Sequence, residues 1–329
     1  MHDMPGPAQG GSAYDGPTYY DRPSLKPAPF NTTVVGGYIF LAGLAGAAQM
    51  LAALVRRARP PGFRRVARTG HALSLLAPTL GAGLLIYDLH TPQRFANMLR
   101  IFRRTSPMSI GTWVLMAFSG SSLATVAADW LGRVPGLRWL RPLGRAAELP
   151  AAVSGAALGT YTASLLSATS TPLWAATPRA LAVRFGASSV ASACAALSLA
   201  ERRADNHRTA RDLDTLALAA LGVELAASLA CRRRWRAVGL GAAEDTVSGK
   251  VLLEGGADLV GTALPIALHA AALAAPPAAS RRGSALGSFA TLIGSLCLRI
   301  GVLEAGDATA LRPRESLGFA QPRNLPRQR

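Results

Sequence analysis

Eight long apolar runs set the organisation of the chain. Each run has the length, about 18 residues or more, that a helix needs to cross the hydrocarbon core of a bilayer. Only helices or closed barrels satisfy every backbone polar group in lipid, and runs of about 20 residues exclude the short strands of a barrel. The pattern predicts an all-α integral membrane protein with eight transmembrane helices at residues 34–55, 70–87, 108–130, 149–168, 180–200, 213–231, 257–275 and 284–303.

The two ends of the chain are more polar than these runs. Residues 1–30 are rich in Gly, Pro and Tyr, and such a composition predicts a partly disordered arm on the membrane surface. They lack the charged start and apolar core of a signal peptide, so the first span is expected to act as the insertion signal. Residues 306–329 form a basic tail, which we expect to be disordered or bound to a partner from Leu311 onwards.

The loop between the second and third spans, residues 88–113, is too long and too polar for a simple reversal of direction. Its charged and titratable side chains are Asp88, His90, Arg94, Arg100, Arg103 and Arg104. Its apolar middle consists of Phe95, Met98, Leu99 and Phe102. This amphipathic pattern predicts a short helix lying on the membrane surface.

Several short motifs accompany this loop. In and after it stand Asp88, Pro92, Arg94, Phe95, Met98, Leu99, the run Ser106-Pro107-Met108-Ser109, Gly111 and Trp113. Elsewhere there are Tyr19-Tyr20, Lys26-Pro27, a glycine-rich first span at 38–46, Tyr161-Thr162, Ser167-Ala168-Thr169 and Pro172-Leu173-Trp174. In these motifs, over about the first 175 residues, the chain resembles the NrfD-type integral membrane subunits, which include the membrane subunit of polysulfide reductase.

The resemblance implies an architecture and partners. It implies two four-helix bundles, here residues 31–175 and 176–305, with the loop 88–113 beside a quinone site in the first bundle. The quinone would be menaquinone or ubiquinone, and electrons would pass to or from an iron-sulfur subunit and, through it, a molybdopterin-type catalytic subunit. Arg94, Arg100, Arg103 and Arg104 are the candidate docking residues for that partner.

Candidate quinone-binding residues lie at one depth. A rise of about 1.5 Å per residue brings Asn31, Asp88, His90 and Tyr161 towards the face that holds both termini, here called the terminal face. Donors there would hold the quinone oxygens, and a carboxylate or imidazole would accept protons from a quinol, which makes Asp88 a candidate catalytic residue. In the family the quinone is held at the start of the first helix and by a tyrosine of the fourth, which correspond here to Asn31 and Tyr161.

Structural interpretations of the same residues remain open. Asp88 could instead cap the surface helix or pair with Arg94. His90 could lie at the lipid headgroups without any catalytic role. Tyr161 can place its hydroxyl on a backbone carbonyl between helices. No histidine follows Asn31 one turn later, where Val34 and Val35 stand. A membrane anchor without quinone chemistry is therefore an alternative, and a transporter is a further one.

Glu224 is a second catalytic candidate, since it lies near the middle of the sixth span. An ionisable group at that depth costs at least about 2.5 kcal/mol unless it is paired, hydrated or protonated, so a proton-handling role is the default hypothesis. Other charged residues near span ends extend such a route or only mark the ends: Asp129, Glu148, Asp258, Arg299 and Glu304.

The net charge and the positions of the cysteines limit which partners and cofactors are expected. The net charge is +17, but the arginines lie between apolar runs without a nucleic-acid motif, so we expect a lipid bilayer and no nucleic acid as partner. Cys194, Cys231 and Cys297 are isolated, and His71 and His269 differ in depth, so no metal, haem or flavin is expected in this chain.

The abundance of Ala, Arg and Gly is typical of a GC-rich bacterial genome, which places this multi-pass protein in the inner (plasma) membrane. Lys and Arg are nearly balanced between the two faces. When the tail is left out, a slight excess on the face opposite the termini puts the termini on the outer side.

Overall fold

A computed structural model describes residues 25–28, 30–58, 60–88, 100–322 and 324–325, except for the side chains of 277–280. Within these ranges the chain is helical and contains no strand. The helices are α1 (Thr32–Ala58), α2 (Arg64–Asp88), α4 (Pro107–Leu131), α5 (Leu140–Ser167), α6 (Pro172–Ala175), α7 (Pro178–Arg203), α8 (His207–Ala237), α9 (Leu264–Ala274), α10 (Pro277–Ala310) and α11 (Pro313–Phe319). A 3₁₀ turn, η3 (Gly241–Ala243), and a π-helix, η4 (Gly249–Ala263), precede α9.

Eight of these helical segments are long and apolar enough to cross a membrane, which confirms the predicted number. The π-helix η4 and α9 together form the seventh span, Gly249–Ala274. Each predicted range lies within the observed helix to within one residue, and α5 begins nine residues earlier than predicted, at Leu140. Hydropathy marks only the part of a helix that meets lipid, whereas backbone hydrogen bonding continues into the headgroup layer.

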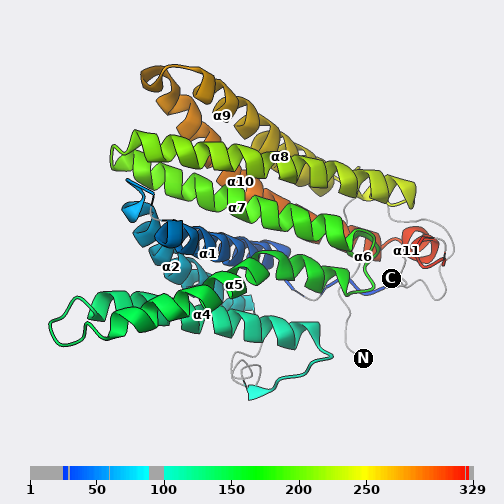
Figure 1. Ribbon diagram of the computed structural model, residues 1–329. Coiled ribbons are helices and arrows are strands. Elements are labelled where there is room, and N and C mark those ends of the chain that lie inside the picture. The colour runs from blue at the N-terminus through cyan, green and yellow to red at the C-terminus, as the bar shows by residue number, and fades with distance from the viewer. Residues whose placement is uncertain (1–24, 29, 59, 89–99, 323, 326–329) are drawn as a thin grey trace.

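Consecutive spans pack as pairs: α1 with α2, α4 with α5, α7 with α8, and η4–α9 with α10. We call α1, α2, α4 and α5 the first helical group, and α7, α8, η4–α9 and α10 the second. Helices α1 and α5 also pack against α7, and α1 packs against α10 (Figure 1). These cross-contacts are extensive, so a division into two separate bundles stays a prediction.

Glycines allow α1 to approach its neighbours closely. A Cβ atom on Gly46 would lie 2.2 Å from the carbonyl oxygen of Gly155 in α5. One on Gly43 would lie 2.4 Å from Ser189 Oγ in α7, and one on Gly36 would lie 2.6 Å from the Ile300 side chain in α10. In lipid, where packing replaces the hydrophobic drive, small residues of this kind determine which helices touch. The glycine-rich first span therefore forms the centre of the molecule.

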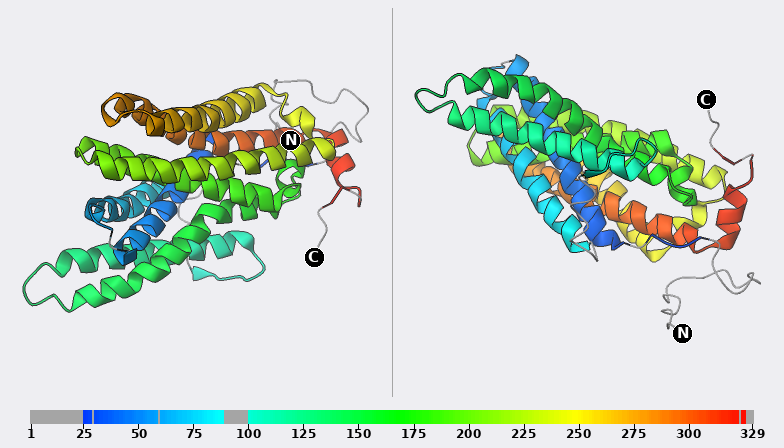
Figure 2. Two further views of the ribbon diagram at one scale, coloured as in Figure 1. Left: turned by 45° about the horizontal axis from the view of Figure 1, so that its top comes forward. Right: turned by 90° about the horizontal axis from the view of Figure 1, so that it is seen from below.

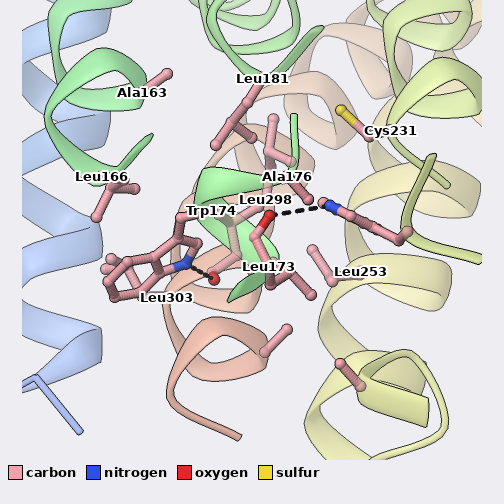
Figure 3. Packing of buried hydrophobic residues seen from close by; sticks show 14 of the residues in the cluster. Ala163, Leu166, Leu173, Trp174, Ala176, Leu181, Cys231, Leu253, Leu298 and Leu303 are labelled. Carbon is pink, nitrogen blue, oxygen red and sulfur yellow. Dashed lines mark hydrogen bonds between the residues drawn. The ribbon is translucent and has the colours of Figure 1, made fainter. Parts of the chain in front are cut away.

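The short helix α6 closes the terminal face of the second group with two aromatic anchors. The indole of Trp174 donates to the carbonyl of Val302 at 2.7 Å, and that of Trp235 donates to the carbonyl of Leu173 at 3.0 Å (Figure 3). Leu173, Trp174 and Trp235 are all buried. Each indole thus fills the core while its N–H group remains satisfied.

Two further features lie at the ends of the spans. The tail after α10 forms α11, whose Phe319 is buried, so the expected disorder is wrong for residues 313–319. Figure 1 shows α6 and α11 at one end of the molecule, whereas the turn between α4 and α5 projects beyond the other helices at the opposite end (Figure 2).

At the terminal face the backbone N–H of Ala28 donates to Asp307 Oδ1 at 3.0 Å, which ties residues 25–28 to α10.

Candidate functional site

A cavity of about 130 Å³ lies among α1, α2, α4 and α5, in the half of the first group nearer the terminal face. Most of its walls are apolar, and its polar side chains are those of Tyr38, Thr112, Tyr161 and Thr162. A cavity of about 150 Å³ accepts a benzene ring, so this space is of the size that takes one aromatic headgroup. The arrangement suits an apolar ring with a small number of polar substituents.

Tyr161 forms one wall of the cavity and touches the start of α4. Its hydroxyl donates a hydrogen bond to the backbone carbonyl of Pro107. Its ring occupies space left by Gly111, where a Cβ atom would lie 2.1 Å from the ring. The structure therefore shows Tyr161 on a backbone carbonyl, and the hydroxyl oxygen keeps its capacity to accept a further hydrogen bond.

Tyr38 stands on the same cavity from α1, a residue that sequence reasoning did not select as a site residue. Residues seven apart lie on the same side of a helix, so Tyr38 follows Asn31 on one face of α1. This spacing is the signal in the sequence that could have identified it.

Asn31 and Asp88 are in contact at the terminal face. Asn31 Oδ1 accepts hydrogen bonds from the backbone N–H groups of Thr33 at 3.0 Å and Val34 at 3.2 Å, as an N-cap does. Asp88 Oδ1 accepts from the backbone N–H of Asn31 at 3.1 Å, which places a carboxylate at the positive end of α1. The two residues thus fix the start of α1 against the end of α2.

The same two residues lie in line with the cavity. Gly81 and Leu85 line it from α2, and Asp88 follows at the next position on that helical face. Asp88 is about 10 Å beyond Gly81 along the helix, at a rise of about 1.5 Å per residue. Asp88 and Asn31 therefore lie between the cavity and the terminal face.

Two other predicted site residues, His90 and Arg94, lie outside the described residues, as does most of the predicted surface helix. Arg100, Arg103 and Arg104 are described and exposed. They precede α4 at the same face as Asp88 and the cavity.

The second half of the loop is fixed to the start of α4. Ser106 Oγ accepts from the backbone N–H of Ser109 at 3.4 Å, and Ser109 Oγ accepts from that of Arg103 at 2.9 Å. The rings of Phe102 and Trp113 meet edge to face with their centroids 5.7 Å apart. Arg100, Arg103 and Arg104 therefore directly precede a helix start that these contacts hold in place.

Glu224 belongs to a different region, the interior of the second group. It is buried in α8 near Arg184, Arg299 and Ser188. Arg299 Nη1 donates to Ser188 Oγ at 3.1 Å, and Arg184 Nη2 lies 2.5 Å from Asp258 Oδ1. The cavity in the first group and Glu224 are therefore two distinct sites, and Arg184 is a charged neighbour that sequence reasoning missed.

Polar side chains continue from Glu224 towards both ends of the second group. Towards the terminal face, Asp258 pairs with Arg232 at 2.5 Å, and Arg232 pairs with Glu254 at 3.1 Å. In between, the hydroxyls of Ser188 and Ser295 lie 2.9 Å apart. Towards the opposite face, the half-buried Arg202 joins a cluster of four buried polar side chains, Ser198, Asp214, His269 and Ser284.

The remaining candidates for a proton route divide between the two groups. Asp258 and Arg299 adjoin Glu224, whereas Asp129 and Glu148 pair with Arg56 in the first group. Glu304 accepts from Thr32 Oγ1 at 3.4 Å, at the terminal end of α10.

Histidines and cysteines are dispersed over the two groups. Across the described ranges, no three His, Cys, Asp or Glu side chains are placed to hold a metal ion. His71 Nδ1 lies 2.9 Å from Gln49 Oε1 in the first group, and His269 Nδ1 lies 3.2 Å from Ser284 Oγ in the second.

Comparison with known proteins assigns the family. The family model described as polysulphide reductase, NrfD, matches residues 23–310, which is most of the chain and includes all eight spans. None of the curated proteins compared with the chain matches it. The protein therefore belongs to the polysulphide reductase NrfD family of multi-pass membrane proteins.

Proposed function

We propose that this chain is the membrane subunit of a quinone-linked oxidoreductase complex and binds a quinone or quinol in the cavity among α1, α2, α4 and α5. The family supports a role as the membrane part of a redox complex. The observation that carries the finer proposal is the apolar cavity flanked by Tyr38 and Tyr161, with Asp88 in line with it at the terminal face.

The residues around the cavity fit a quinone headgroup. The phenolic hydroxyl of Tyr38 would donate a hydrogen bond to a carbonyl oxygen of the quinone, and the hydroxyl oxygen of Tyr161 would accept one from an O–H group of the quinol. The apolar walls would contact the ring. Asp88, with Asn31 in contact with it at the terminal face, would accept protons at its carboxylate, and His90 is proposed as a further quinone-binding residue. When bound, menaquinone or ubiquinone supplies the two-electron, two-proton redox chemistry.

Electrons require a partner. We propose that an iron-sulfur subunit docks on Arg94, Arg100, Arg103 and Arg104, of which the last three are exposed beside the start of α4. This surface and the cavity lie at the same face, so a cluster docked there would approach the quinone. A molybdopterin-type catalytic subunit would be the third chain of the complex.

Glu224 is proposed as a proton-handling residue of the second group. The observation in its favour is the sequence of polar side chains on both sides of it, from Asp214 and Ser284 to Asp258 and Arg232. Unpaired buried polar atoms occur there too, at Arg184 Nε and Nη1 and at Arg299 Nε. Such atoms are commonly satisfied by ordered water, which also conducts protons.

The proposed setting is the bacterial inner membrane, with the termini on the outer face. Two alternatives make different predictions. A pure membrane anchor requires no quinone binding, and a transporter would use broken helices at matching depths of the two halves.

Quinone binding to the purified full-length protein in detergent tests the proposal. Quenching of a fluorescent quinol analogue should saturate with wild type and weaken by about tenfold or more in Tyr161→Phe and in Asp88→Asn. Matched controls are Tyr87→Phe, an exposed tyrosine beside Asp88, and Asp245→Asn, an exposed carboxylate at the terminal face. A folded wild-type protein that shows no saturable quenching would favour the anchor.

A further inference from the structure

A second cavity, of about 900 Å³, lies at the opposite end of the first group from the proposed quinone site. It is open on one side and is bordered by the end of α1, the turn into α2, the end of α4 and the first turns of α5. The residues that line it are Val55, Arg56, Pro60, Pro61, Gly62, Phe63, Arg64, Ala67, Arg68, His71, Asp129 and Arg145. Basic side chains and apolar walls thus share one space.

The acidic groups of this cavity are already paired. Asp129 Oδ2 lies 2.5 Å from Arg56 Nη1, and the buried carboxylate of Glu148 lies 3.3 Å from both Arg56 Nε and His71 Nε2. One arginine and a histidine therefore face two carboxylates at the inner wall.

Three further arginines remain without a carboxylate. Arg64, Arg68 and Arg145 line the cavity, are exposed, and form no ion pair within the described part of the chain. They come from two helices, α2 and α5, so their charges face one space from two sides. Together they leave the cavity with an excess of positive charge, and guanidinium groups bind phosphate oxygens in pairs.

The position of the cavity matches the depth expected for lipid headgroups. It is formed where α1 and α4 end and α2 and α5 begin. Trp130 and Trp139, at the ends of the α4–α5 turn, are 70% and 62% exposed. Exposed tryptophans gather at the boundary between hydrocarbon and water, which is the level of lipid phosphates.

We propose that this cavity binds a phosphate-bearing anion through Arg64, Arg68 and Arg145. Two sources share that chemistry, the headgroup of an anionic phospholipid and free phosphate. The volume and the apolar walls at Val55, Pro61 and Phe63 exceed the needs of a free ion and match a headgroup with its glycerol. Basic pockets between transmembrane helices have this preference in general.

A bound phospholipid would join the ends of four helices. Among its described residues the first group has no short helix such as α6 to close this end, and its α4–α5 turn projects beyond the other helices (Figure 2). Ligand binding to the folded state alone stabilises that state, so occupancy should raise the melting temperature. The α4–α5 hairpin is the element that would be held.

The test uses the full-length protein, freed of lipid in detergent and titrated with phosphatidylglycerol, phosphatidylcholine or inorganic phosphate. Native mass spectrometry counts bound molecules, and a thermal melt reports stabilisation. The triple variant R64Q/R68Q/R145Q is compared with the control R203Q/R208Q/R282Q, which removes three exposed arginines from the same face outside the cavity.

We expect phosphatidylglycerol to bind wild type and the control alike, with at least tenfold weaker binding to the R64Q/R68Q/R145Q variant and little effect of phosphatidylcholine. R64K/R68K/R145K should recover part of the affinity, which separates charge loss from misfolding. Binding of inorganic phosphate with the same dependence, and no lipid binding, would identify the free ion as the source. The proposal would be overturned if R64Q/R68Q/R145Q bound lipid and phosphate as tightly as R203Q/R208Q/R282Q does. It would also be overturned if wild type bound neither ligand.

Discussion

The two helical groups differ in where their charged side chains lie. In the first group, half-buried ion pairs gather at the opposite face, around Arg56 and Glu148, and its middle is apolar around Ala45, Ala77, Phe118 and Leu158. In the second group, charged side chains lie in the interior itself, with Arg184 and Arg299 almost completely buried. The first group therefore offers space with polar ends, and the second offers fixed charge with little space.

This difference separates two tasks that a quinone-linked membrane subunit would combine. An apolar ring enters a cavity more easily than a charged network, because charged side chains would have to lose their partners. A proton, by contrast, moves only along titratable groups and water. On the proposed function, the first group would bind the quinone and the second would handle protons.

The largest expected effect tests the charged interior. Arg299→Gln removes hydrogen bonds to Ser188 and Ser295 and lowers the positive charge near Glu224. Removing one partner of a buried charged cluster costs about 3–5 kcal/mol, so the free energy of unfolding in mixed micelles should fall by that order. The exposed Arg282→Gln is the control.

A double-mutant cycle sharpens this result. If the two charges are coupled, Glu224→Gln should cost less in the Arg299→Gln background than in wild type. An equal cost of Glu224→Gln in both backgrounds would show that the two buried charges are not coupled.

The next effect tests the tight packing of α1. Gly46→Ala places a Cβ atom 2.2 Å from a backbone oxygen of α5, which cannot move as a side chain can. Such overpacking costs about 1–3 kcal/mol in the free energy of unfolding. Gly83→Ala in α2 has nothing within 4 Å, and we expect it to be neutral or to stabilise the helix by up to about 1 kcal/mol. Similar melting curves for the two variants would contradict the close approach of α1 and α5.

A third prediction concerns the cavity itself. Gly111→Ala directs a methyl group into the ring of Tyr161, so the tyrosine must shift at the cavity wall. We expect quinol-analogue binding to weaken about tenfold, which corresponds to about 1.4 kcal/mol. Gly120→Ala, on the same helix with nothing within 4 Å, should bind as wild type does. Unchanged affinity in Gly111→Ala would place the ligand elsewhere.

Hydropathy and residue counting predict different parts of this structure. Hydropathy found all eight spans because lipid requires a long apolar run, but it missed the start of α5, where Arg141 and Arg145 interrupt the apolar pattern. Counting residues placed Asn31 and Asp88 at one depth, and the structure shows them in contact.

Rotation about the helix axis is the information that depth counting lacks. Tyr38 was missed for this reason, since its place on the cavity depends on which side of α1 faces α5. Arg184 was missed because its partner, Asp258, comes from a span distant in sequence. The roles of Asn31, Asp88, His90, Tyr161 and Glu224 stay proposals.

The smallest effect separates two roles of Asn31. Its side-chain oxygen caps α1, so Asn31→Ala should lower the free energy of unfolding by about 1 kcal/mol, the usual cost of losing a cap. Asn31→Ser keeps a capping oxygen but removes the amide group, and it should restore stability. If Asn31 also contacts the quinone headgroup, Asn31→Ser will be as stable as wild type and still bind the quinol analogue more weakly. If it acts only as a cap, stability and binding will recover together, and the headgroup contacts at this face would rest on the two tyrosines, Asp88 and His90.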